Sequence, residues 1–161
     1  MDDLMLARAL HVLGVVVWIG GLSMVTSVAL PAIRRGALGS DWPKAFAAIE
    51  RRFVWQARIS VLTVGATGYH LCDRLDLWPR FQQPAFWWMH AMVGVWTVFF
   101  LFLFVGEPLV LDRYFPGWAE KDPARAFRWM WRAHVVLLAA SVVTVLGAVA
   151  GAHGAVFSGL G

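Results

Sequence analysis

The chain has 161 residues, of which 60% are hydrophobic and 15% are charged, and its mean hydropathy of +0.64 excludes an ordinary soluble domain. A single cysteine, Cys72, excludes an internal disulfide and a cysteine-rich metal site. The net charge of +4 does not indicate nucleic-acid binding, because the basic residues lie between apolar stretches, where they set membrane orientation.

Four apolar stretches are long enough to cross a membrane as helices, since a hydrocarbon core ~30 Å thick needs about 20 apolar residues. They cover residues 4–30, 53–72, 86–111 and 133–157. Because only short connections remain, we expect one all-α domain over residues 1–161, an integral membrane antiparallel four-helix bundle. The first stretch is too long for a cleaved signal peptide and lacks a basic leader, so we expect it to be retained as a helix.

The segments between these spans carry helix-boundary and turn signals. The first span is expected to end at Pro31. Ser40 and Asp41 predict an N-cap, with Pro43 in the first turn of a helix that leads into the second span. The other connections are expected to be a loop over residues 74–84, a loop over residues 112–122, and a basic, aromatic turn over residues 125–132.

Lysine and arginine are distributed unevenly between the two sides of this arrangement. The side with both termini has 3 of the 14 basic residues, and the other side has 11. The positive-inside rule therefore places both termini in the periplasm of a bacterial inner membrane. Tryptophans near the span ends are expected to form interfacial belts, with Trp78, Trp87 and Trp88 on one side and Trp42, Trp55, Trp118, Trp129 and Trp131 on the other.

Each span contributes one histidine at the outer level, and these four are His11, His70, His90 and His153. His134 alone falls on the cytoplasmic side. Imidazole is a common ligand of haem iron and copper, and helical bundles build such sites from facing helices. We therefore predict a cofactor or metal site at the four histidines, the alternative being hydrogen bonds to water and lipid headgroups.

Haem b is the first hypothesis for this site. In an up-and-down bundle the diagonal pairs are His11 with His90 and His70 with His153. Trp18 and Trp96 lie in the middle of their spans and would form the walls of a porphyrin slot, the alternative being that they fill the core. Ordinary helix packing explains equally well the small residues that would make room for a porphyrin, which are Gly14, Gly20, Gly21, Gly65, Gly68, Gly94, Gly147 and Gly151.

Copper is the alternative cofactor, and Met89 and Met92 beside His90 offer it soft donors. An iron held by two histidines has no open position, which favours electron transfer. The expected partner is then a periplasmic protein or a quinone, and association into homo-oligomers through the small-residue faces is left open. A haem-dependent oxidoreductase would require one weak axial ligand.

Two charged residues, Arg58 and Glu107, are expected to dip into the membrane at the cytoplasmic end. They would pair with each other, or Glu107 would pair with Arg128 or Arg132, but we favour snorkelling of each charge to the interface. The basic residues between Arg125 and Arg132 predict an orienting signal and a contact with anionic lipid.

The stretch LHVLGVVVWIGGL, residues 10–22, resembles the first helix of the CopD-like membrane domain and of the HemJ-type small membrane proteins. The resemblance implies a b-type haem or a copper role and carries over to His11. HemJ-type proteins use an intramembrane lysine, whereas Lys44 and Lys121 lie outside the predicted spans, so we do not expect their porphyrinogen oxidation. His11 with Trp18, and His90 with Trp96, suggest an approximate relation between the first and third spans.

Overall fold

The structure, a computed structural model, describes residues 3–37 and 42–154, with the backbone alone described for 42–47, 110–112 and 116. Its elements are helical, and no strand occurs within these ranges, which confirms the all-α prediction. Three helical segments are long and apolar enough to cross a membrane. These are Asp3–Arg34, Pro84–Leu109 and Pro123–Ala152.

The predicted second span lies within α3 (Trp42–Arg74), which is not among these three segments. Between Arg58 and Asp73 the helix has 14 residues without a charged side chain. At 1.5 Å per residue this stretch is about 21 Å long, which is shorter than a hydrocarbon core of ~30 Å. Helix α3 can therefore cross a membrane only if Arg58 is accommodated inside it.

The first helical segment continues past Pro31, so the predicted end at this proline is wrong. Helix α1 (Asp3–Met24) passes through a π-helical stretch, η1 (Val25–Ala29), into α2 (Leu30–Arg34). Pro31 lies in the first turn of α2, where its missing N–H and fixed φ are tolerated. Gly36, with φ of +72°, follows the end of α2.

The third segment also changes to π-helix. Helix α4 (Trp87–Leu101) continues as η4 (Phe102–Leu111) and then as α5 (Asp112–Lys121), so the loop predicted at 112–122 is wrong. Helix α5 is held by aromatic packing, because Phe115 and Trp118 both contact the ring of Trp129, with centroids 6.5 and 6.0 Å apart.

The remaining boundary predictions have mixed outcomes. Residues 125–132 form the first turns of α6 (Pro123–Ala152) rather than a separate turn, and the Asp122 side chain caps this helix by accepting a hydrogen bond from the Arg125 N–H at 3.0 Å. The connection at 74–84 contains the 3-10 turn η2 (Trp78–Gln82), and η3 (Pro84–Phe86) follows. Helix α3 begins at Trp42 and includes Pro43, whereas the expected cap at residues 40–41 lies outside the described residues.

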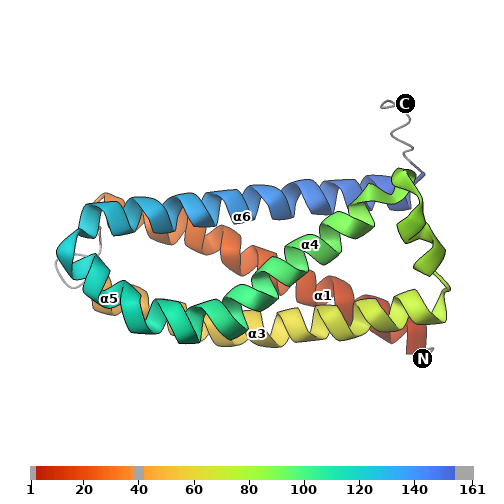
Figure 1. Cartoon of the computed structure of the whole chain (residues 1–161), viewed down its shortest axis with the longest axis horizontal. Helices are drawn as coiled ribbons and strands as arrows, with labels where there is room; N and C mark the ends of the chain where they lie inside the picture. Colours follow the sequence, from red (N-terminus) through yellow and green to blue (C-terminus); the bar gives the residue numbers. More distant parts are fainter. Residues whose placement is uncertain (1–2, 38–41, 155–161) are drawn as a thin grey trace.

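The long helices alternate in direction (Figure 1). Helix α1 packs along α3, and α4 packs against α6. The main core joins α1, α3 and the α4–η4 segment, and its buried members are Trp18, Leu22, Val54, Ala57, Val61, Val64, Phe99 and Leu103. Many apolar side chains instead point outward, and Val16, Val136 and Leu146 are 61–66% exposed. This exterior suits a hydrocarbon surrounding.

At several glycines, an aromatic ring of the same chain packs directly against the backbone, in the space that a Cβ atom would occupy. A Cβ atom on Gly65 would lie 2.6 Å from the Trp96 ring, and one on Gly151 would lie 2.5 Å from the Trp88 ring. Gly21 and Gly147 meet Phe53 and Trp87 in the same way. Helix packing therefore accounts for these glycines. Trp88 is buried against α6 and is not part of an interfacial belt, contrary to the sequence prediction.

We expect Gly65→Ala to destabilise the fold by about 1–3 kcal/mol, because the added methyl group overpacks a fixed ring. The ring cannot withdraw easily, since Trp96 Nε1 donates a hydrogen bond of 2.8 Å to the Val61 carbonyl. The control is Gly94→Ala, where no atom lies within 4 Å of the new Cβ. Thermal unfolding in detergent should show a lower Tm for Gly65→Ala only. Equal Tm values for the two variants would contradict close packing of the Trp96 ring on Gly65.

Candidate functional site

The four histidines predicted as ligands lie at one end of the molecule. Three of them lie at the start of α1, the end of α3 and the start of α4, and His153 directly follows α6; these helix ends are all at the right-hand end of the molecule in Figure 1. We call this the histidine end, defined by His11, His70, His90 and His153. His134 precedes His153 by 19 residues, or about 28 Å along a helix.

The histidines share an end but not a coordination sphere. Among the described residues, no three His, Cys, Asp or Glu side chains lie close enough to hold a metal ion. His90 is exposed and meets the Phe81 ring edge-on, with centroids 5.3 Å apart. His153, also exposed, follows the last turn of α6. The described residues therefore do not form a metal site with three or more such ligands.

His11 is held in a defined tautomer by α3. Its Nδ1 lies 3.1 Å from Thr67 Oγ1, and the Thr67 hydroxyl donates its own hydrogen to the Thr63 carbonyl at 2.6 Å. The Thr67 oxygen must then accept, so His11 Nδ1 carries the proton. The other ring nitrogen, Nε2, keeps its lone pair. This is the arrangement found when histidine binds a metal through Nε2 and is oriented through Nδ1–H.

Two residues of α3 position His11: Thr67, which was not predicted, and Gly68, which was predicted only as one of the small residues that make room for a porphyrin. Gly68 provides space for the imidazole, because a Cβ there would lie 3.2 Å from His11 Cε1. Thr67 supplies the acceptor. A signal for this contact exists in the sequence, since Thr63, Thr67 and His70 lie at helical spacing i, i+4 and i+7 and form a polar stripe on one face of α3.

His153 and His134 are oriented by their own helix. Their Nδ1 atoms lie 2.8 and 2.9 Å from the carbonyl oxygens of Val149 and Met130. A carbonyl only accepts, so each Nδ1 carries a proton, and in the neutral form of the ring the lone pair is on Nε2. His134 therefore has the same tautomer as His11 at a position far from the histidine end, which makes it a matched control.

His70 has a different environment. Its Nε2 lies 3.5 Å from Asp3 Oδ2, and the same carboxylate oxygen is 3.5 Å from the Arg74 guanidinium. The imidazole nitrogen that would bind a metal thus faces a carboxylate. Of the two predicted diagonal pairs, His70 with His153 is therefore the less suitable.

Arg58 and Glu107 form an ion pair, so the prediction that each charge snorkels to the interface is wrong. The Arg58 guanidinium contacts Glu107 Oε2 at 2.5 Å, and both side chains are about one-fifth exposed. Arg58 Nε and a terminal nitrogen also donate to the Leu103 carbonyl, at 3.1 and 2.9 Å. Trp55 and Phe104 flank the guanidinium, at 5.5 and 5.8 Å from ring centroid to Cζ.

The backbone of η4 explains why Arg58 is needed there. In a π-helix the carbonyl of residue i accepts from the N–H of residue i+5. For Leu103 that residue is Pro108, which lies inside η4 and has no N–H. Arg58 supplies the donors that Leu103 would otherwise lack. The guanidinium thus joins α3 to η4 by an ion pair and by completing the backbone hydrogen bonding.

We expect Arg58→Met to destabilise the protein by roughly 2–4 kcal/mol, because it removes the ion pair with Glu107 and both hydrogen bonds to the Leu103 carbonyl. In a Pro108→Ala background, which restores an N–H, the same substitution should cost about 1 kcal/mol less. Unfolding of all four forms in detergent measures this coupling. The control Arg52→Met changes an exposed arginine on the same helix, and additive effects of Arg58 and Pro108 would contradict the backbone role.

Comparisons with protein-family models, with curated protein sequences and with solved structures find no match to this chain. The likeness of residues 10–22 to the CopD-like first helix therefore stays an expectation, and the functional argument depends on the chain's own residues.

Proposed function

We propose that this chain is a bacterial inner-membrane protein that binds haem b at the histidine end and transfers electrons. In this proposal the helices form an antiparallel four-helix bundle with both termini in the periplasm, as the 3 to 11 distribution of basic residues favours. The observation that carries the proposal is His11, whose imidazole is oriented by α3 through Nδ1, so that the neutral ring presents the lone pair of Nε2. The other three histidines at the same end supply candidates for a second ligand.

We assign the second ligand to His90, on α4. His90 has no polar partner among the described residues, whereas His70 faces Asp3 and Arg74. His90 lies on α4, which packs mainly against α6, so its pairing with His11 would link α4 to α1. When bound between two imidazoles, haem supplies reversible one-electron redox chemistry. Thr67 and Gly68 then act as positioning residues for His11.

Copper is less well supported as the cofactor. The Met89 side chain is buried, at 6% exposure, whereas its neighbour His90 is exposed. Adjacent residues of a helix do not share a face, so Met89 and His90 do not present their donors together. Metal analysis of the purified protein separates the two cofactors, because copper retained without porphyrin would replace the haem proposal.

The first test is the absorption spectrum of protein purified in detergent after haem-replete expression. We expect a Soret band in the wild type, its loss or shift in His11→Ala, and no change in His134→Ala. The two histidines share a tautomer but lie at different helix levels, so the comparison isolates position. Absence of a Soret band from folded wild-type protein would refute haem binding, and loss of the band in His134→Ala would refute the site.

Carbon monoxide tests the coordination of the iron. Two strong imidazole ligands leave no position for an external ligand, so the ferrous protein should show no prompt spectral change when carbon monoxide is added. A rapid change would mean that one axial position is open or weak. Substrate could then reach the iron, as a haem-dependent oxidoreductase requires, and the proposal of a closed electron-transfer site would be wrong. His90→Ala provides the positive control, because it should open that position.

A further inference from the structure

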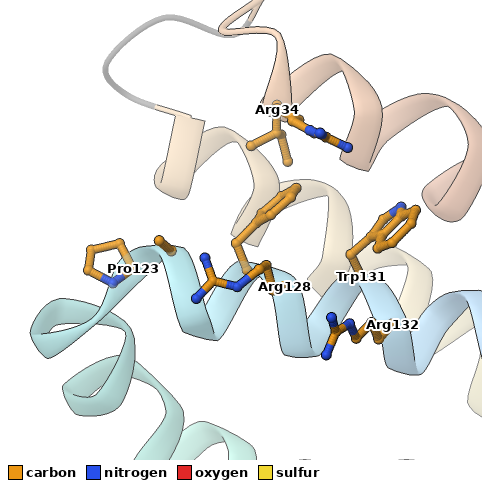
Figure 2. Close-up of a pocket in the computed structure, with 8 residues that line it drawn as sticks. Arg34, Pro123, Arg128, Trp131 and Arg132 are labelled. Carbon is orange, nitrogen blue, oxygen red and sulfur yellow. The ribbon is translucent and has the colours of Figure 1, made fainter.

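The opposite end of the molecule, where α2 ends and α6 begins, contains a basic pocket that the proposed function does not use. Its volume is about 530 Å³, within the range of roughly 300–1,000 Å³ typical of small-molecule sites. Arg34 on α2 lies across this pocket from Arg128 and Arg132 on α6 (Figure 2). Ile33, Phe127 and Trp131 give it an apolar wall.

Charge in this pocket is of one sign. None of the described residues that line it is a carboxylate, and Arg34, Arg128 and Arg132 make no ion pair with any described residue. Arg128 and Arg132 are also four residues apart on one helix, where like charges repel each other. A bound anion would remove this repulsion. Guanidinium groups bind phosphate oxygens in bidentate fashion, which makes a phosphate group the best match.

A second cavity lies beside the first and shares Arg128 and Arg132 with it. Its volume is about 410 Å³, and its other lining residues are Arg125, Trp118 and Trp129. The two central arginines thus have an aromatic, basic cavity on each side. Tryptophan and arginine together are typical of the depth where lipid headgroups meet acyl chains. A free inorganic phosphate would make no use of the apolar walls.

We propose that this basic pocket, defined by Arg34, Arg128 and Arg132 with Ile33, Phe127 and Trp131, binds the headgroup phosphate of an anionic phospholipid. The arginines bind the phosphodiester, and the aromatic and aliphatic wall contacts the glycerol and the start of the acyl chains. The bound lipid joins α2 to α6, two elements that are far apart in sequence. The site is separate from the histidines, so it stands or falls independently of the haem proposal.

Binding can be measured by native mass spectrometry of the full chain in a neutral detergent, titrated with dioleoyl phosphatidylglycerol. We expect the triple variant Arg34→Gln, Arg128→Gln, Arg132→Gln to bind at least about tenfold more weakly than the wild type. The control is Arg51→Gln with Arg52→Gln, which removes exposed charges that do not line the pocket and should bind like the wild type. Circular dichroism checks that each variant is folded.

Three further measurements identify the ligand and keep the test valid if the triple glutamine variant does not fold. The triple lysine variant of the same positions keeps every charge but cannot bind in bidentate fashion, so it should be several-fold weaker than the wild type. Phosphatidylcholine, with a neutral headgroup, should bind weakly. Equal affinity of the wild type and a folded triple variant would overturn the site. Protection of the protein against heat by inorganic phosphate alone, to the same extent as by the lipid, would overturn the assignment to lipid.

Discussion

Helix α3 can cross an apolar layer only if the charge of Arg58 is stabilised there, and the hydrogen bonds of its guanidinium group provide that stabilisation. A charge in hydrocarbon is tolerated only when it is paired, and a backbone carbonyl there also needs a donor. Both needs meet at η4, where Glu107 is the counter-ion and Leu103 is the carbonyl that Pro108 leaves without its π-helical donor. An irregular stretch in one helix therefore provides the polar site that its charged neighbour requires.

The lengths of apolar runs were sufficient to predict helices, their approximate positions and the common end of four histidines. Those features depend on chain connectivity and on the 1.5 Å rise per residue. The π-helical stretches, the helical state of α5 and the seating of Trp88 on Gly151 were not predicted, because they depend on contacts between helices. Pro31 shows the limit of a local signal: a proline ends a helix unless a boundary already lies just before it.

For the candidate site, the sequence predicted the level of each histidine along its helix but not the direction in which each histidine faces around the helix axis. Depth follows from the residue number along a helix, whereas lateral position depends on how each helix is rotated about its axis. Apolar residues occur all around these helices, so the pattern gives little information on rotation. His11 is the exception because the polar stripe of Thr63, Thr67 and His70 marks the face of α3 that meets it. His90 has no such stripe opposite it.

The two ends of the molecule are suited to different chemistry, and their separation limits what the protein can do. Imidazoles gather at the histidine end, while arginines gather at the other, with an apolar core of Trp18, Phe99 and their neighbours between them. His134 is the single described histidine outside the histidine end, about 28 Å along the helix from His153. Under the proposed function, one haem could not carry an electron across that distance without a second centre. Electron exchange would then begin and finish at the histidine end, and the opposite end, with the basic pocket of Arg34, Arg128 and Arg132, would anchor the protein in the membrane.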